Sequence, residues 1–238
     1  LAGIHEPDAA EFAEHLLEGK ALITENSAHF GYFLAGLGAA QVPQNVHATV
    51  IGSGRIAESV SRHLGDMLGT PLQRTGDVIE AFEGYDFVVV ASDSLQPGLF
   101  YDADEAAAET GTPWQLVYAD GGEVVVGPTF IPGLTADYYA MDTLDEAGRT
   151  MRMDYQFLKS AIPAVQASAQ VPLMVADLAA SYASMATMQH LSGVGSYLEN
   201  HLLRIDLERM HVIRDRVLRL ARTPRDLASR DDLRHPFL

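Results

Sequence analysis

Short apolar runs alternate with helical patterns along the middle of the chain. Residues 46–51, 85–91 and 114–118 are apolar runs of strand length. Between them, apolar residues recur at helical spacing over 56–68 and 102–110. Uninterrupted apolar strands are typical of parallel sheets that are buried on both faces. The alternation of strand and helix therefore predicts a doubly wound α/β sheet.

Weaker signals complete this pattern. The remaining expected elements are a strand at 72–74, a helix at 78–82, a hairpin strand at 123–127 after a glycine turn, a helix at 171–191 and two strands within 201–220. Residues 1–45 form a separate region, in which Asp8 and Glu11 make a capping box for a helix. We therefore divide the chain into an N-terminal helical segment with a linker, residues 1–45, and an α/β domain, residues 46–238.

A glycine-rich turn follows the first strand of the α/β domain. Gly52, Ser53 and Gly54 lead directly into the helix that contains Ala57, which matches the dinucleotide-binding fingerprint. The first glycine makes the tight turn, the second lets the backbone approach a phosphate, and Ala57 keeps the helix close to the sheet. The fold class is therefore α/β, with a Rossmann-like mostly parallel sheet, helices on both faces, C-terminal helices and an antiparallel hairpin.

Two further residues belong to this candidate nucleotide crevice. Dinucleotide-binding proteins carry an acid about 20 residues after the turn, where this chain has Arg74. Arg74 could accept the 2′-phosphate of NADP, or it could be a solvated surface arginine. Asp93 follows the strand at 85–91, at the sheet edge where ligands bind. It could approach a magnesium ion, or it could cap the turn that follows it.

Composition narrows the possible partners. The formal net charge is −16, from 32 acidic and 16 basic residues. A field of this sign repels nucleic acid and anionic membranes, so it favours either solubility alone or a basic partner protein or peptide. The chain has no cysteine, which excludes thiolate zinc sites and enzyme-bound thioesters and is compatible with the cytoplasm. Its 9 histidines are scattered, so we expect no metal site.

Several motifs together resemble the ThiF-like superfamily of adenylating, ubiquitin-activating-type proteins. They are the glycine turn, residues 85–93 (YDFVVVASD), 111–114 (GTPW), 126–133 (VGPTFIPG), Thr135-Ala136 and residues 190–193 (HLSG). The resemblance covers roughly residues 46–225. It is greatest to the branch that partners YcaO-type cyclodehydratases in making azole-containing ribosomal peptides.

The chain departs from this family at its zinc site. Many relatives hold a structural zinc with two Cys-x-x-Cys pairs. At the matching positions this chain has Asp137 and Ala140, and then Asp226 and Ser229. The resemblance therefore implies that zinc has been lost as a unit.

The chain also departs from the family's ATP chemistry. Active adenylating members neutralise the phosphates with an arginine and a lysine and hold the ribose with an aspartate. Here no lysine lies between Lys20 and Lys159, and Arg74 stands near the place of the ribose acid. Adenylyl transfer depends on such electrostatic clamps. The crevice of Gly52, Ser53, Gly54, Ala57, Arg74 and Asp93 is therefore expected to be vestigial and to contain no catalytic residue, with residual ATP or NADP binding left open.

The resemblance implies a role in binding. In this branch the ThiF-like protein binds the leader of a precursor peptide, commonly through a winged-helix element near its N-terminus, and delivers the peptide to the YcaO enzyme. Only the end of such an element would fit in residues 1–45. The superfamily commonly dimerises, and the apolar helix at 171–191 is a candidate for the face of a homodimer. The alternatives are an NADP-dependent oxidoreductase and an adenylating enzyme with an unusual site.

Overall fold

A computed structural model describes residues 45–149, 152–161 and 170–221. The helix expected after Asp8 and the second zinc-pair position, Asp226 and Ser229, lie outside these residues. The division of the chain at residue 45 stays a prediction.

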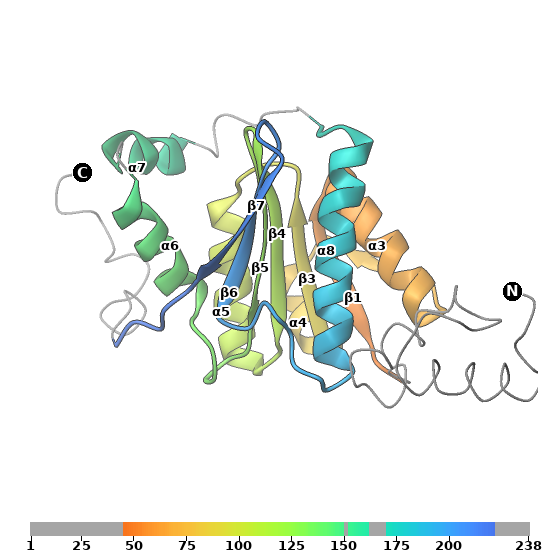
Figure 1. Cartoon of the computed structure of the whole chain (residues 1–238). Helices are drawn as coiled ribbons and strands as arrows, with labels where there is room; N and C mark the ends of the chain where they lie inside the picture. The colour runs from red at the N-terminus through yellow and green to blue at the C-terminus, as the bar shows by residue number, and fades with distance from the viewer. Residues whose placement is uncertain (1–44, 150–151, 162–169, 222–238) are drawn as a thin grey trace, which may run out of the picture.

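One seven-stranded sheet runs through the molecule, in the order β2-β1-β3-β4-β5-β6-β7 (Figure 1). Its strands are β1 (Ala48–Ser53), β2 (Arg74–Thr75), β3 (Phe87–Ser92), β4 (Trp114–Asp120), β5 (Glu123–Phe130), β6 (His201–Asp206) and β7 (His211–Arg216). Strands β2, β1, β3 and β4 pair in parallel, and the pairings from β4 to β7 are antiparallel. The expected α/β class is confirmed, and the C-terminal hairpin joins the same sheet.

Helices cover both faces of this sheet, as expected. They are α3 (Arg55–Leu68), α4 (Val78–Gly84), α5 (Pro97–Thr110), α6 (Tyr138–Gly148), α7 (Arg152–Ala161) and α8 (Leu173–Leu191). Helices α3 and α8 pack together on one face, while α4, α5 and α6 cover the other (Figure 1). Helix α7 packs on α6, away from the sheet.

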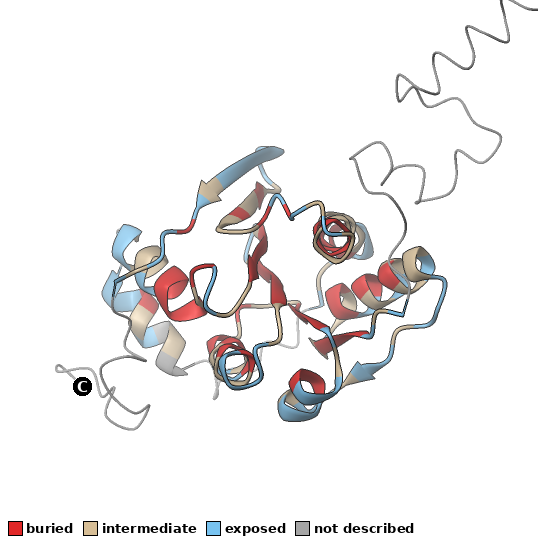
Figure 2. Cartoon of the chain, turned by 90° about the horizontal axis from the view of Figure 1, so that it is seen from below, coloured by how far each residue is buried: buried red, intermediate tan, exposed pale blue. Residues whose placement is uncertain are grey.

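The core has two layers, one on each face of the sheet (Figure 2). Strand β3 contributes to both, because its side chains alternate between the faces. Val89 and Ala91 pack toward α3 and α8, whereas Val88 and Val90 pack toward α4 and α5. This explains why the run at 85–91 is apolar without interruption.

Several elements differ in extent from the sequence prediction, and three of these differences have a clear physical reason. Strand β2 has only two residues, Arg74–Thr75, because it lies at the edge and pairs with β1 alone. Helix α5 begins at Pro97 rather than at 102, since proline suits the first turn of a helix. Strand β5 continues to Phe130, because Phe130 pairs with Trp114 of β4.

Helix α8 matches the apolar pattern at 171–191, but its middle turns are covered within the chain. Small residues such as Ala176, Ala179 and Ala183 are fully buried, which lets the helix pack closely on α3 and on β4 and β5. Only the first turn exposes large apolar side chains, Leu173 and Met174. Most of this helix is therefore unavailable as a dimer face. Within the described residues, no helix is long and apolar enough to cross a membrane.

Candidate functional site

The glycine turn connects β1 to α3 at the carboxyl edge of the sheet, between β1 and β3. Gly52 has a φ of 116°, and a Cβ atom there would lie 1.9 Å from the carbonyl oxygen of Ala91 on β3. A side chain at this position would separate the two strands. The first glycine of the motif is thus required by the pairing of β1 with β3.

The second glycine makes room for a carboxylate. Asp93, just after β3, accepts hydrogen bonds from the backbone N–H groups of Arg55 (3.0 Å) and Ile56 (2.8 Å) in the first turn of α3. A Cβ atom on Gly54 would lie 2.4 Å from the Cγ atom of Asp93. In dinucleotide-binding folds the N–H groups at this helix end bind a phosphate. Here the side chain of Asp93 occupies them.

The segment before α8 is also held at this turn. The backbone N–H of Val171 donates to the carboxylate of Asp93 at 3.3 Å, and the guanidinium of Arg55 donates to the carbonyl oxygen of Val171 at 3.1 Å. Sequence reasoning missed both Arg55 and Val171. They lie 116 residues apart, and neither belongs to a local motif that could have identified the contact.

Asp93 had been expected either to approach a magnesium ion or to cap the turn that follows it. In that turn the hydroxyl of Ser92 accepts the hydrogen bond from the Ser94 N–H, at 3.3 Å. Asp93 instead caps α3, a helix that follows a different strand. A magnesium role stays a prediction.

The structure brings Arg74 to the same turn. Its guanidinium lies 3.5 Å from the carbonyl oxygen of Gly52 and 3.7 Å from the carboxylate of Glu58 on α3. Arg74 therefore lies beside the glycine turn, where Glu58 partly neutralises its charge, and its role toward a ribose or a 2′-phosphate stays a prediction. Ser53 is exposed at the end of β1, and Ala57, in the first turn of α3, is fully buried. All six residues of the predicted crevice thus lie at or beside one turn.

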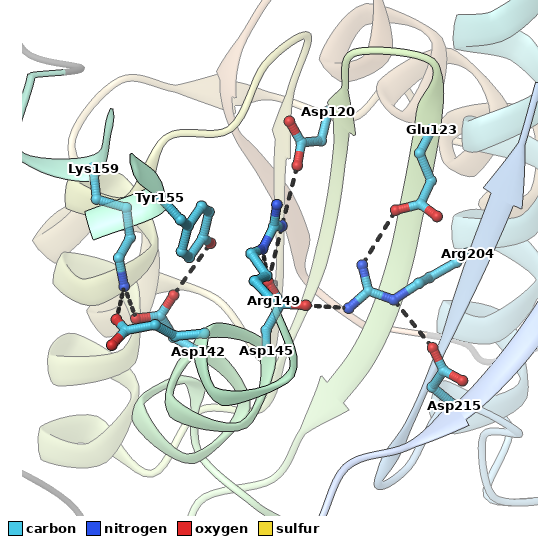
Figure 3. A network of polar contacts seen from close by, with 10 residues as sticks. Asp120, Glu123, Asp142, Asp145, Arg149, Tyr155, Lys159, Arg204 and Asp215 are labelled. Atoms are coloured by element: carbon cyan, nitrogen blue, oxygen red, sulfur yellow. Dashed lines mark hydrogen bonds and ion pairs between the residues drawn. The ribbon is translucent and has the colours of Figure 1, made fainter. Parts of the chain in front are cut away.

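A second polar cluster lies on the other side of β4 and is centred on Arg204 (Figure 3). The guanidinium of Arg204 is bound by Glu123 at 3.2 Å, by Asp215 at 3.0 Å and by Asp145. Burial would lower the pKa of Arg204, but the neighbouring carboxylates, Asp145 above all, raise it above its usual value. Arg204 therefore stays charged and joins α6, β5, β6 and β7.

A cavity of about 660 Å³ opens beside this cluster, between α6, the β4–β5 turn, β6 and β7. Its charged lining consists of four acids and three arginines, and two of the arginines, Arg149 and Arg204, are bound by these acids. Arg149 binds Asp145 at 2.9 Å and Asp120 at 3.3 Å. The cavity therefore offers no excess of positive charge that would favour an anion.

The lysine within the described residues, Lys159, belongs to the junction of α6 and α7. Its ammonium group lies 2.6 Å from Asp142 and 3.0 Å from Glu146. Burial would raise the pKa of Glu146, but hydrogen bonds from Lys159, Gln156 and Arg152 lower it below its ordinary value. Lys159 is thus bound between two carboxylates.

The first zinc-pair position has become a helix cap. Asp137 accepts a hydrogen bond from the backbone N–H of Ala140 at 2.7 Å and begins α6. In the part of the chain that the structure describes, no group of three or more histidine, cysteine or acidic side chains could hold a metal ion. The residues at this position do not fit the family's zinc.

The chain is similar in fold to several solved structures. No protein-family model and no curated protein matches the sequence. Among solved structures, Escherichia coli MccB with MccA-N7isoASN matches with a TM-score of 0.65 at 14% identity, over 94% of this chain and 83% of that one. A heterocyclase in complex with substrate and cofactor matches with a TM-score of 0.65 at 15% identity, over 93% of this chain and 31% of that one. The heterocyclase TruD matches with a TM-score of 0.65 at 18% identity, over 90% of this chain and 33% of that one.

These identities are low, so the likeness concerns the fold. The chain spans about a third of each heterocyclase and most of MccB. Structural similarity to MccB and to the two heterocyclases is thereby shown at the level of the fold. The chain has the α/β fold that MccB shares with part of the heterocyclases.

Proposed function

We propose that this chain is an accessory component of a system that modifies ribosomal peptides. It binds the leader of a precursor peptide and presents that peptide to a YcaO-type cyclodehydratase, without adenylating anything itself. The similarity to MccB, crystallised with forms of MccA, and to heterocyclases, one of them crystallised with substrate, supports this reading.

The single observation that carries the proposal is the contact between Asp93 and the first turn of α3. A nucleotide phosphate would need the N–H groups of Arg55 and Ile56, which the carboxylate of Asp93 already occupies at 3.0 and 2.8 Å. A phosphate that entered beside this carboxylate would also meet repulsion between like charges. The turn is thus complete without a nucleotide.

The positive charges that a working ATP site would use already have partners within the chain. Arg74 lies 3.7 Å from Glu58, the guanidinium of Arg55 donates to the carbonyl oxygen of Val171, and Lys159 lies between Asp142 and Glu146. Transfer of an adenylyl group needs cations that stabilise the charge of the transition state, worth several kcal/mol. A chain without them is better suited to binding than to catalysis.

The net charge of −16 fits a role in assembly. An acidic surface attracts a partner with a basic face and speeds their association. We therefore expect the cyclodehydratase to present a basic face to this chain.

A pull-down with the cyclodehydratase and the precursor peptide encoded beside this chain tests the proposal. We expect both to be retained, and we expect cyclodehydration to proceed faster when this chain is added. An Asp66→Ala variant, changed at an exposed acid in the last turn of α3, serves as the control and should retain both partners. If neither the cyclodehydratase nor the precursor peptide were retained, the proposal would be wrong. Exchange of pyrophosphate into ATP by this chain alone would replace it with an adenylating function.

A further inference from the structure

Strand β7 ends the sheet, and only one of its two edges is paired within the described residues. Strand β6 pairs with it along its whole length, from His211 to Arg216. In the strand order, β7 stands at the opposite end of the sheet from β2, and Figure 1 shows β7 beside β6 at the front of the molecule. An unpaired edge presents a row of N–H and C=O groups to which another strand can add.

The register identifies the groups that face outward. In an antiparallel pair, successive residues alternate between bonding their partner and pointing away from it. The N–H of Val217 donates to the carbonyl oxygen of Asn200 at 2.8 Å, which sets this alternation for β7. Counting back from Val217, the residues that direct both backbone groups away from β6 are Val212, Arg214 and Arg216.

These three residues also place their side chains on one face of the strand, because side chains alternate with a period of two. Val212 is 43% exposed, and Arg214 and Arg216 are exposed as well. The guanidinium of Arg214 donates to the carbonyl oxygen of Tyr197 at 2.9 Å and lies 5.5 Å from the centre of its ring. This contact joins Arg214 of β7 to the segment that precedes β6.

The charge of this edge is opposite to that of the whole chain. Two of the three outward-facing residues of β7 are arginines, Arg214 and Arg216, and the strand contains one acid, Asp215. That acid pairs with Arg204 at 3.0 Å. The edge is therefore a basic strip on a protein of net charge −16.

We propose that the outer edge of β7 binds an extended acidic peptide, which adds to the seven-stranded sheet as a further strand. Backbone bonds to Val212, Arg214 and Arg216 supply affinity, as in other cases of strand addition. Directly opposite residues on adjacent strands interact in pairs, so the peptide carries acids opposite Arg216 and Arg214 and an apolar residue opposite Val212. The acids are thus two positions apart. In taking this peptide to be part of the precursor, the inference rests on the proposed function.

Two proline variants of the full chain separate binding from folding. Val212→Pro removes an N–H that faces outward and keeps the pairing with β6, since proline is tolerated on the open side of an edge strand. Ile213→Pro removes an N–H that bonds to β6 opposite Arg204, so it destabilises the hairpin itself. Only the first variant tests the edge in a folded protein, and circular dichroism checks that it is folded.

Binding is measured by fluorescence anisotropy with a labelled extended peptide in which two glutamates stand two positions apart and a valine stands two positions beyond the second. We expect this acidic peptide to bind the wild type, and we expect the same peptide with lysine in place of both glutamates not to bind. Val212→Pro and Arg216→Glu should each weaken binding about tenfold, which corresponds to the loss of about 1.4 kcal/mol. Arg209→Glu makes the same change of charge in the turn before β7, where the side chain is 79% exposed, and should weaken binding less than about twofold.

Three results would overturn the inference. Equal binding of the acidic peptide by the wild type and Val212→Pro would show that the edge is not used. Failure of the peptide to bind the wild type would mean that the arginines only protect the edge from pairing. A wild-type dimer that Val212→Pro dissociates in sedimentation would assign the edge to a second copy of the chain.

The native precursor peptide distinguishes this inference from the proposed function. If the precursor binds wild type and Val212→Pro equally well, the edge is excluded and the proposed function stands. If it binds neither while the acidic peptide still binds the wild type, the proposed function fails and the edge remains a peptide site.

Discussion

The carboxylate of Asp93 accepts a hydrogen bond from the backbone N–H of Ile56 at 2.8 Å, so β3 provides the N-terminal cap of α3. The cap position itself is Gly54, which has no side chain to do this. Asp93→Ala should lower the free energy of unfolding by about 2 kcal/mol, because it leaves the first N–H groups of α3 without a partner. Urea denaturation measures this change. Asp66→Ala, an exposed acid in the last turn of α3, should cost less than about 0.5 kcal/mol.

Gly54 and Asp93 should be energetically coupled. Gly54→Ala places a methyl group 2.4 Å from the Cγ atom of Asp93, at a φ of 93°. The substitution should cost about 2–4 kcal/mol in the wild type and at least about 1 kcal/mol less in Asp93→Ala, where the clash is removed and only backbone strain remains. A double-mutant cycle by urea denaturation measures the coupling. Strictly additive changes in the free energy of unfolding would show that Gly54 and Asp93 are not energetically coupled.

Removal of Asp93 should convert the turn into an anion site. In Asp93→Ala the N–H groups of Arg55 and Ile56 lose their carboxylate and become available to a phosphate. Pyrophosphate at millimolar concentration should then raise the melting temperature of Asp93→Ala and leave the wild type unchanged. Differential scanning fluorimetry with sulfate as a second anion makes the comparison. Stabilisation of the wild type by pyrophosphate would contradict the view that the turn is already filled.

The sheet could be predicted from the sequence because its central strands are buried on both faces. The run at 85–91 is apolar throughout, and it proved to be β3, with Val88 and Val89 facing opposite layers of the core. Strand β2 was harder to place, because an edge strand of two residues leaves almost no periodic signal. The extension of β5 to Phe130 depends on pairing with Trp114, which only tertiary structure specifies.

The position of the candidate site could be predicted from the sequence, but the group that binds to the first turn of α3 could not. The glycine spacing located the turn, and the end of the strand at 85–91 brought Asp93 to it. Whether the first N–H groups of α3 face a phosphate or a carboxylate depends on a contact across 37 residues of chain. The Arg204 cluster was missed for the same reason, since its acids come from β5, α6 and β7.

The Arg204 cluster should contribute strongly to stability. The side chain of Arg204 is 19% exposed and binds Glu123, Asp145 and Asp215. Arg204→Ala leaves these carboxylates close together without a cation and should cost about 2–3 kcal/mol. Arg209, 79% exposed and paired only with Asp206 at 3.5 Å, is a matched control for which alanine should cost less than about 0.5 kcal/mol. Equal costs in chemical denaturation would show that the cluster adds nothing to the fold.

The junction of α6 and α7 should loosen in acid. Although burial would raise the pKa of Glu146, hydrogen bonds from Lys159, Gln156 and Arg152 lower it below the ordinary value of 4.5. A lowered pKa means that the charged form is stabilised in the folded state, so this contribution is complete above pH 4.5 and is lost as the pH falls through the lowered pKa. Carboxyl-carbon NMR of Glu146 should therefore give a midpoint below 4.5 in the wild type.

Replacement of Lys159 should move that midpoint upward. Lys159→Gln removes a cation that lies 3.0 Å from Glu146 and whose side chain is only 15% exposed. Arg152→Gln removes a partner whose side chain is 58% exposed, so that water screens its charge. Both variants should raise the pKa of Glu146, and Lys159→Gln should raise it more. The loosening of α7 in acid should also begin at a higher pH in both variants, and at the higher pH of the two in Lys159→Gln. Near-ultraviolet circular dichroism follows this loosening through Tyr155, whose ring lies 4.9 Å from the Lys159 ammonium. An unchanged midpoint in Lys159→Gln would mean that Lys159 does not set the charge of this junction.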